Sequence, residues 1–520
     1  MADIEKFYGY PEVLINGDGY MQQQPADFIG GVPEPLHLSS WFIISTELCE
    51  RFTYYGASLM FAQYLKNELN MKKTDQVSII RGFTFFCYFT TLFGAFIADQ
   101  YLGKYITIAG FASWYILGIS LLSISTLTSI ERSVRLALFI ISTYVFIGVG
   151  TGGIKSNVSV FVAEQVKTGY KATKIPGVYI DSRATIERCY RYFYLAINVG
   201  GFSGMLLCPQ LAKNVNYFTA YVVPAGVMAV GLIIFVPGYS LYVKKPVGQS
   251  PFVKVYRTIR YALKNKNPNN AHWLDSSKGL KDAEWDDKYV DGLKRSIRAC
   301  KVFLFYPIYW ALYNNMTDNF INQGLEMKRP NWLSADQLNV INSAVLIVTI
   351  PIFDTWVFPA LAKRGIYLGP IKKFFIGFMI VSAGFVYVTV IQKFVYKSGP
   401  YYEFNSPDVP EDAYNDISIW WQVPAYVCIG ISEIFTSITG LEYAFSQAPA
   451  ELKSTLTALF LLSNAGGSLL GMILAIWSGD PTVLYTFAAQ SIIMFLFGIA
   501  FYLVFRHYDE EVRLQITYEG

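Results

Sequence analysis

The sequence has little charge for its length. Asp, Glu, Lys and Arg make up 15% of the 520 residues, against about 25% in ordinary soluble proteins, and 53% of the residues are hydrophobic. So few charges cannot cover a soluble surface of this size, so lipid must be the solvent for much of the chain. The net charge of +4 is small, and no basic block with interleaved aromatic residues lies on a compact module, so no nucleic-acid partner is expected.

Cysteine and histidine are also scarce. The six cysteines lie in or beside apolar runs and form no Cys-x-x-Cys pair, so neither a zinc site nor a disulfide framework is expected. The three histidines, His37, His272 and His507, lie outside the predicted membrane helices, so a proton relay within the membrane must use carboxylates. The sequence offers no nucleophile–base pair, metal-ligand cluster or cofactor loop. We therefore expect no cofactor, no bound metal and no enzymatic activity.

Long apolar runs dominate the chain after residue 40. A helix needs about 20 apolar residues to cross roughly 30 Å of hydrocarbon, and the sequence contains twelve such runs. We therefore predict an all-α membrane protein with twelve transmembrane helices. A polar, basic linker at 244–300 separates an N-terminal six-helix bundle at 41–243 from a C-terminal six-helix bundle at 301–506. Residues 1–40 lack the basic start and apolar core of a cleavable signal, so they are predicted as a flexible cytoplasmic tail, and 507–520 as a second one.

The distribution of basic residues predicts the orientation in the membrane. With both termini in the cytoplasm, the inner loops hold most of the loop Lys and Arg residues, as the positive-inside rule requires. The acidic loop at 397–416 then lies outside, with Glu403, Asp408, Glu411 and Asp412. We expect a monomer embedded in the lipid bilayer of the plasma membrane. Two six-helix halves joined by a polar linker are typical of the major facilitator superfamily, whose substrate site lies between the halves.

The first predicted helix carries three ionisable residues within five positions. Such groups cost at least a few kcal/mol at membrane depth unless they are paired or hydrated, so each needs a reason. Glu47, Glu50 and Arg51 are spaced three and four residues apart and face one side of the helix. A salt bridge between Glu47 and Arg51 accounts for two of them and leaves a second carboxylate. A further cation or a proton must balance it, and we interpret this imbalance as functional.

Two more ionisable residues lie in later membrane helices. Lys155, in the glycine-rich fourth helix, supplies a cation to the first half. Glu433, in the middle of the tenth helix, has no basic residue within four positions. An unpaired carboxylate at this depth is protonated or receives a cation, so Glu433 is predicted to bind a substrate amine. Cations in one half and an acid in the other would hold the two ends of a zwitterion such as a short peptide.

Three segments resemble the motifs of a known family. Residues 47–56, Glu-Leu-Cys-Glu-Arg-Phe-Thr-Tyr-Tyr-Gly, match the ExxERFxYYG signature of the proton-dependent oligopeptide transporters. Residues 94–104 resemble that family's motif at the turn between helices two and three, and 193–200 resemble its fifth-helix motif. The likeness extends over nearly the whole chain from residue 41, and the basic extensions at 165–190 and 244–300 resemble the fungal branch.

The resemblance implies proton-coupled uptake of di- and tripeptides by alternating access. Glu47 and Glu50 would carry or relay the proton, in alternation with Arg51 and Lys155 as their partners. The remaining implied roles are the peptide carboxylate for Arg51 and Lys155, the peptide amine for Glu433, Asn198 and Asn342, and the pocket wall for Tyr54, Tyr55, Tyr88 and Phe460. Simple packing remains an alternative for the tyrosines and for Asn342.

Departures from the family pattern and rival functions bound this prediction. Arg81 occupies the position of a helix-two histidine in the animal branch, and Phe460 stands where some relatives have tryptophan. The carboxylate available in helix seven is Asp318, to which the sequence assigns no role. A nitrate transporter of the same fold is one alternative, although relatives with that role usually lack the helix-one glutamates. A receptor that binds peptide without moving it is another, although only the basic linker could serve signalling.

Overall fold

The computed structural model describes most of the chain between residues 30 and 519. The described residues are 21, 30–167, 169–173, 178–245, 247, 251–266, 270, 272–280, 283–357, 360–361, 364, 368–404, 409–410, 413–449 and 452–519. Most of the predicted N-terminal tail, and Asp408, Glu411 and Asp412 of the predicted outer loop, lie outside this set.

The N-terminal half crosses the membrane six times. Its helices are α2 (Leu38–Ser58) continued by α3 (Phe61–Asn67), α4 (Lys73–Ile97), α5 (Gly103–Ser125), α6 (Arg132–Ile140) continued by a π-helical stretch (Ile141–Gly148) and α7 (Val149–Ala163), α8 (Ser182–Asn214), and α9 (Tyr217–Phe235).

The C-terminal half supplies the other six crossings. Its helices are α12 (Tyr306–Tyr313) with α13 (Asn319–Leu325), α14 (Val340–Ile352), α16 (Pro370–Lys397), α17 (Val423–Glu433) continued by a π-helical stretch (Ile434–Ile438) and α18 (Thr439–Gln447), α19 (Lys453–Leu474), and α20 (Val483–Glu519). Between the halves lie α10 (Pro251–Lys264) and α11 (Asp287–Phe303), joined by the 3-10 segment η4 (Trp273–Ser277).

Length and hydropathy alone find nine candidate spans among the described residues. The span Lys73–Ser125 has 53 residues, and a straight helix of that length would extend about 80 Å, far more than one bilayer. The chain turns at Gly103, whose φ of 75° suits glycine, so this span contains two crossings. The first crossing escapes the search because of its three charges, and the seventh because it is interrupted at Asp318.

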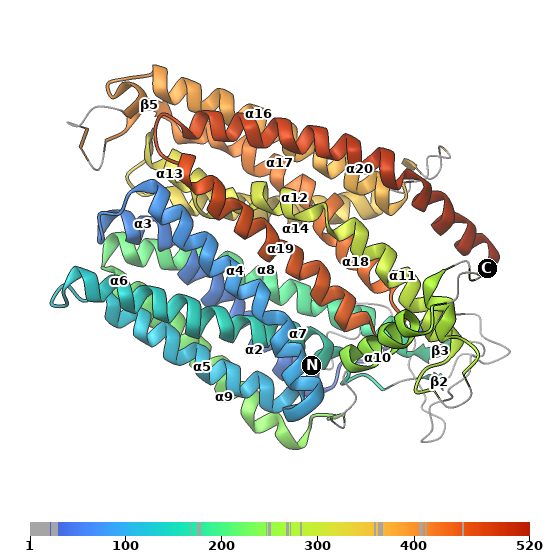
Figure 1. Ribbon diagram of the computed structural model, residues 1–520. Coiled ribbons are helices and arrows are strands. Elements are labelled where there is room, and N and C mark those ends of the chain that lie inside the picture. The colour runs from blue at the N-terminus through green and yellow to red at the C-terminus, as the bar shows by residue number, and fades with distance from the viewer. Residues whose placement is uncertain are drawn as a thin grey trace.

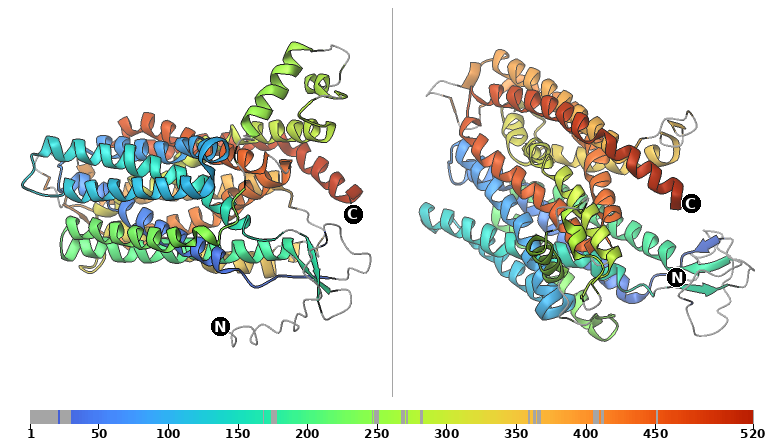
Figure 2. Two further views of the ribbon diagram at one scale, coloured as in Figure 1. Left: turned by 90° about the horizontal axis from the view of Figure 1, so that it is seen from below. Right: turned by 45° about the vertical axis from the view of Figure 1, so that its right-hand side comes forward.

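Figure 1 shows the two halves side by side, the N-terminal half in blue to green and the C-terminal half in yellow to red. They meet where α4 packs against α19 and where α8 packs against α14. The linker helices α10 and α11 and the small sheet of β1 (Gly30–Val32), β3 (Val178–Asp181) and β2 (Tyr170–Ala172) lie at the same end of the bundle, on different sides of it (Figure 2). The short parallel pair β4 (Met327–Lys328) and β5 (Asn415–Ser418) lies at the other end.

The outer surface of the crossings is apolar. Ile233, Ile476 and Leu503 expose 69%, 68% and 60% of their surface, although each lies in a crossing or at its end. A soluble protein rarely exposes so extensive an apolar surface, whereas lipid covers it without cost. Because a helix can continue into water, hydropathy does not mark helix ends, and α20 extends through 507–519, which the sequence assigned to a tail.

Candidate functional site

The charged residues of α2 form a compact buried group. Arg51 Nε lies 3.0 Å from a carboxylate oxygen of Glu47, and the Arg51 guanidinium also pairs with Glu50. Glu47 and Arg51 are each 3% exposed and Glu50 is fully buried. Thr151 of α7 donates a hydrogen bond of 2.5 Å to Glu50, which ties the group to the fourth crossing. One cation therefore faces two carboxylates, and the second carboxylate gains only a neutral hydroxyl.

Glycines in α7 allow this close approach. A Cβ added to Gly152 would come within 2.0 Å of the Thr90 hydroxyl, and one added to Gly153 within 2.2 Å of the Phe111 ring. A larger residue at either position would push α7 away from α4 or α5, because backbone contact of this kind requires small residues. The glycine-rich segment thus sets how closely α7, which carries Thr151 and Lys155, packs against α4 and α5.

Lys155 points its ammonium group at an aromatic ring. Its Nζ lies 4.0 Å from the centre of the Tyr88 ring, within the range of a cation–π contact. Among the residues that the structure describes, no carboxylate lies within ion-pair distance of it. The Arg51 guanidinium has a similar position 5.4 Å from the centre of the Tyr54 ring, in addition to its two carboxylates.

Glu433 ends α17, where the helix widens into the π-helical stretch Ile434–Ile438. Such stretches often occur at functional positions of helices. Asn342 of α14 donates a hydrogen bond of 3.0 Å to the Glu433 carboxylate, and Tyr313 lies within electrostatic range of it. Both residues are neutral, and no Lys or Arg within the described ranges pairs with Glu433. Its negative charge is therefore solvated but not balanced.

Tyrosines of the first half lie between these charges. Tyr55 is close enough to interact electrostatically with Arg51, Lys155 and Glu433, and Tyr88 interacts with Arg51 and Glu433. The rings of Tyr54 and Tyr55 meet edge to face at 5.3 Å. The cations of one half and the acid of the other therefore lie within electrostatic range of the same tyrosines.

Two predicted site residues have other contacts. The Asn198 amide donates a 2.8 Å hydrogen bond to the Tyr194 carbonyl of its own helix, although Tyr194 itself lies within electrostatic range of Glu433. Phe460 is fully buried and does not join this group. Its ring packs at 5.2 Å and 5.0 Å against those of Phe303 and Tyr306, inside the C-terminal bundle.

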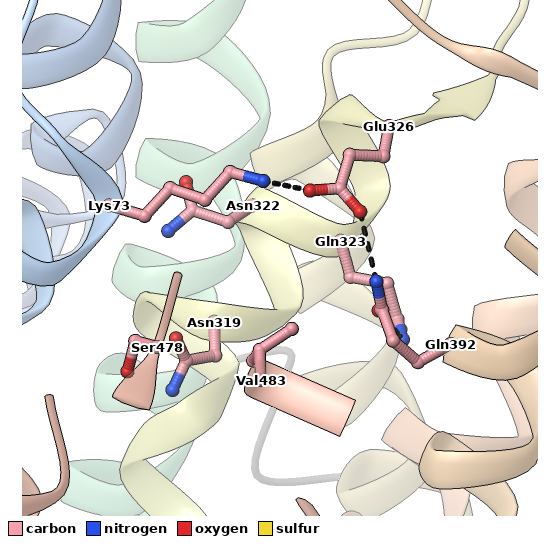
Figure 3. Close-up of a pocket in the computed structure, with 8 residues that line it drawn as sticks. All are labelled: Lys73, Asn319, Asn322, Gln323, Glu326, Gln392, Ser478 and Val483. Atoms are coloured by element: carbon pink, nitrogen blue, oxygen red, sulfur yellow. Dashed lines mark hydrogen bonds and ion pairs between the residues drawn. The ribbon is translucent and has the colours of Figure 1, made fainter. Parts of the chain in front are cut away.

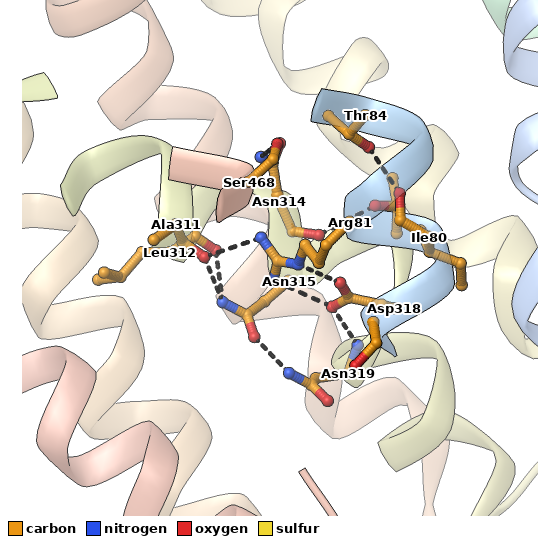
Figure 4. Close-up of polar contacts among 12 residues, drawn as sticks. Ile80, Arg81, Thr84, Ala311, Leu312, Asn314, Asn315, Asp318, Asn319 and Ser468 are labelled. Carbon is orange, nitrogen blue, oxygen red and sulfur yellow. Dashed lines mark hydrogen bonds and ion pairs between the residues drawn. The ribbon is translucent and has the colours of Figure 1, made fainter. Parts of the chain in front are cut away.

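A buried ion pair between Arg81 and Asp318 connects the two halves (Figure 4). Arg81 Nε lies 2.5 Å from Asp318, and a terminal guanidinium nitrogen donates to the Ala311 carbonyl at 3.1 Å. Both side chains are 1% exposed. Sequence reasoning singled out both residues but did not pair them. The signal that could have paired them was a cation without a known partner in the membrane region of one half and an acid without a known partner in that of the other.

A second cross-bundle group lies farther toward the end that carries β4 and β5. Lys73 of α4 forms an ion pair with Glu326 (Figure 3) and another with Asp480. Gln392 donates to Glu326 at 3.0 Å, and the Tyr396 hydroxyl donates to Asp480 at 2.6 Å. Sequence reasoning missed this group, because Lys73 and Asp480 lie at the predicted ends of crossings, where charges need no explanation.

A small polar cavity adjoins Lys73 and Glu326. Its walls include Asn319, Asn322, Gln323, Gln392 and Ser478. Asn322 is 4% exposed and both polar atoms of its side chain lack a hydrogen-bond partner within the described chain, as does the Ser478 hydroxyl. Buried polar atoms of this kind ordinarily bind water. We therefore expect the cavity to hold water beside the Lys73 ion pairs.

Further hydrogen bonds join the halves at this end. The Gln63 side chain donates to the Ser334 hydroxyl at 2.9 Å, and the Gln210 side chain donates to the side-chain amide oxygen of Gln337 at 2.8 Å. Lys213 donates to the Leu333 backbone carbonyl at 3.2 Å. The end of the molecule opposite the linker is thus closed by direct contacts between the two bundles.

Known proteins resemble this chain in sequence and in fold. The POT family profile matches residues 105–503. The probable peptide transporter ptr2 of Schizosaccharomyces pombe is 39% identical over 518 residues, covering 96% of this chain and 82% of the relative. The peptide transporter PTR2 of Saccharomyces cerevisiae is 36% identical, covering 94% and 82%. A crystal structure of the POT family transporter PepTSo superposes with a TM-score of 0.74 at 23% identity, covering 93% of this chain and 99% of the other.

These likenesses confirm three predictions made from the sequence. The fold is that of the major facilitator superfamily, with twelve transmembrane helices in two bundles of six. The family and its curated members are transporters and not enzymes. The chain is an integral membrane protein and belongs to the POT family of proton-dependent oligopeptide transporters.

Proposed function

We propose that this protein takes up di- and tripeptides together with protons by alternating access. One observation carries the proposal: Lys155 in the first half and Glu433 in the second are charges without an ionic partner in the described chain, and both lie near Tyr55 and Tyr88. A ligand with a carboxylate at one end and an ammonium at the other would balance both. The two yeast relatives named above are called peptide transporters, and peptides have these two ends.

The two peptide ends take different partners. Arg51 and Lys155 bind the carboxylate, and Glu433 binds the ammonium with help from Asn342 and Asn198. Hydrogen bonds between charged groups are roughly twice as strong as neutral ones, and a water-poor site strengthens them further. The same bonds draw the two bundles toward each other. Tyr54, Tyr55 and Tyr88 form the wall between the two ends.

Proton coupling follows from the excess carboxylate on α2. Glu47 and Glu50 share the single cation Arg51, so protonation of either one weakens its hold on the guanidinium. The released Arg51 then binds the peptide carboxylate together with Lys155. The membrane potential supplies about 2.3 kcal/mol per charge for each 100 mV, before any pH gradient is counted. If Glu50→Gln retained full proton-driven accumulation, this part of the proposal would fail.

The contacts opposite the linker serve as the outer gate. We place both termini and the linker in the cytoplasm of a plasma-membrane monomer, so the ion pairs of Lys73 and the hydrogen bonds of Gln63, Gln210 and Lys213 close the outer entrance. These contacts must break for peptide to enter from outside.

Uptake by reconstituted protein tests the function. Proteoliposomes loaded with dialanine are diluted into labelled dialanine, with and without an inward proton gradient. We expect counterflow without the gradient and accumulation with it, and loss of both in Glu433→Gln. Glu442→Gln, an exposed carboxylate of the same crossing, is the matched control and should keep activity. Binding without any accumulation would favour a receptor, and competition by nitrate in place of peptides would favour an anion transporter.

A further inference from the structure

The linker helix α10 presents a basic face that no described part of the chain covers. The stretch 251–266 contains five basic residues and no acidic one. Its exposed residues on α10 are Tyr256, Arg257, Arg260, Leu263 and Lys264. Successive residues of a helix are about 100° apart, so these five fall within an arc of roughly 120°. Tyr256 and Leu263 are each 61% exposed, which adds apolar surface to the basic face.

The opposite face of α10 is occupied by packing within the linker. Thr258 and Ala262 are fully buried. The Ser277 hydroxyl of η4 donates a 3.2 Å hydrogen bond to the Thr258 carbonyl, and the rings of Tyr261 and Trp285 lie 6.2 Å apart. One side of the helix therefore packs against the rest of the linker. The exposed side is the opposite one and is not part of the linker's core.

Most of the positive charge on the exposed side is unbalanced. Arg257 pairs with Glu284 at 2.5 Å, and Lys254 lies 4.4 Å from the Tyr289 ring centre. Arg260, Lys264 and Lys266 have no acidic partner within the part of the chain that the structure describes. Because α10 contains no acidic residue, its exposed face carries a net positive charge and produces a positive electrostatic potential around it.

α10 follows the sixth crossing along the chain and lies beyond the end of the bundle. The sixth crossing ends in the 3-10 turn Val236–Ser240, and α10 begins at Pro251. Tyr239 and Leu241, at this junction, are 54% and 50% exposed. Figure 2 (left) shows the light-green linker helix leaning away from the end of the bundle and extending beyond the outline of the crossings. Lipid surrounds those crossings, so α10 extends over the headgroups of the adjacent leaflet.

We propose that the face of α10 formed by Tyr256, Arg260, Leu263 and Lys264 binds the anionic lipid headgroups of the leaflet beside it. Basic residues with interspersed aromatic and aliphatic side chains are the composition of helices that lie in the membrane interface. The cations attract the headgroup charge, and Tyr256 and Leu263 enter the boundary between headgroups and acyl chains. This inference depends on the membrane location of the protein and not on its substrate.

Fluorescence quenching in nanodiscs tests the contact. A bimane probe is attached at Leu263→Cys, and at Asn265→Cys as the matched position on the other side of the helix; labelled wild type corrects for native cysteines. The nanodiscs contain phosphatidylcholine with or without phosphatidylserine, and a headgroup spin-labelled lipid as quencher. We expect strong quenching at Leu263→Cys only with phosphatidylserine and weak quenching at Asn265→Cys. Equal quenching at both positions, or no dependence on lipid charge, would overturn the proposal.

Charge removal gives an independent readout on the same labelled protein. Each cation near an anionic surface contributes about 1 kcal/mol, or roughly fivefold in the binding equilibrium. Arg260→Gln with Lys264→Gln should therefore lower the ratio of bound to unbound helix by roughly 25-fold. Lys288→Gln, an exposed lysine of α11, should leave it unchanged. A double variant that quenches like the parent would also overturn the proposal. No peptide is present, so failure here is distinct from failure of the transport proposal.

Discussion

Two groups of charge within the membrane region differ in whether the protein itself balances them. Arg81 with Asp318, and Lys73 with Glu326 and Asp480, place opposite charges in direct contact across the two bundles. Lys155 and Glu433 also lie within the membrane region on opposite bundles. In the described chain, however, their nearest contacts are an aromatic ring and a neutral hydrogen-bond donor.

The difference distinguishes a contact that holds the two halves together from a site that binds a ligand or a proton. A charge without an ionic partner in the membrane region is costly, so we interpret one as a position where a ligand or a proton completes it. The paired group closes one end of the molecule. The unpaired group, Lys155 and Glu433, marks the position where a ligand would supply the two opposite charges that the protein lacks.

The largest effect is expected when one partner of the paired group is removed. Asp318→Asn leaves the Arg81 guanidinium buried without its counter-charge, and such changes cost about 3–5 kcal/mol. We expect a marked fall of the Tm in detergent. The double variant Arg81→Gln with Asp318→Asn should recover most of the loss, because it buries no unbalanced charge. A single variant as stable as wild type would remove the distinction drawn above.

The next effect concerns the unpaired group and appears in transport, not in stability. Lys155→Gln removes the cation that would bind the peptide carboxylate. We expect uptake to fall about 100-fold, equivalent to roughly 2.7 kcal/mol. The Tm should stay the same or rise, because the native state loses an unbalanced charge. Tyr88→Phe keeps the ring beneath Lys155 and should retain most of the uptake. A large drop in Tm for Lys155→Gln would place it with the paired group.

Much of the fold could be predicted because the bilayer imposes a simple rule on sequence. Apolar runs of sufficient length identified the crossings, including the first, whose three charges hide it from a hydropathy search. Helix ends could not be predicted in the same way. The fifth crossing begins at Ser182 in a polar, basic segment, because a helix that leaves the lipid can continue in water.

The sequence could point to a candidate site residue where one residue's environment is extreme, but it could not show which two residues meet. Glu433 stands alone on its own helix, and that isolation was visible in the sequence. Arg81 and Asp318 are 237 positions apart, and only the folded structure brings them together. The contribution of Phe460 to a pocket depends on which way its ring points. In the structure the ring packs within the C-terminal bundle, and its role in a pocket stays a prediction.

A smaller effect on stability is expected at the Lys73 group. The number of unbalanced charges that each substitution leaves decides which variant is less stable. Lys73 faces two acids, so Lys73→Met leaves two negative charges together, whereas Glu326→Gln leaves one cation and one acid. The Lys73 side chain is 18% exposed, so water softens the loss to about 1–2 kcal/mol. We expect Lys73→Met to lower the Tm more than Glu326→Gln does. The reverse order would mean that the group is held by Glu326 alone and not by charge balance.

The smallest effect belongs to the ion pairs of the linker, which lie in water. A hydrogen bond from Lys294 lowers the pKa of Asp275, and one from Lys278 lowers the pKa of Asp291. A carboxylate with a lowered pKa stabilises the fold above its ordinary pKa and loses this effect as the pH falls through the lowered value. Exposed pairs contribute only about 0.2–1 kcal/mol each. Asp275→Asn should therefore raise hydrogen exchange in 272–303 slightly at neutral pH.

The linker should consequently not set the pH dependence of uptake near neutrality. Burial lowers the pKa of His272 below its ordinary 6.5, so the imidazole is neutral above that pH and the linker loses stability only as the pH falls below it. Above pH 6.5 Asp275 is ionised and His272 is mostly neutral. His272→Gln should leave the pH profile of uptake in this range unchanged, whereas Glu50→Gln should flatten it. A profile that moved with His272→Gln would transfer proton sensing from the unbalanced membrane charges to the linker.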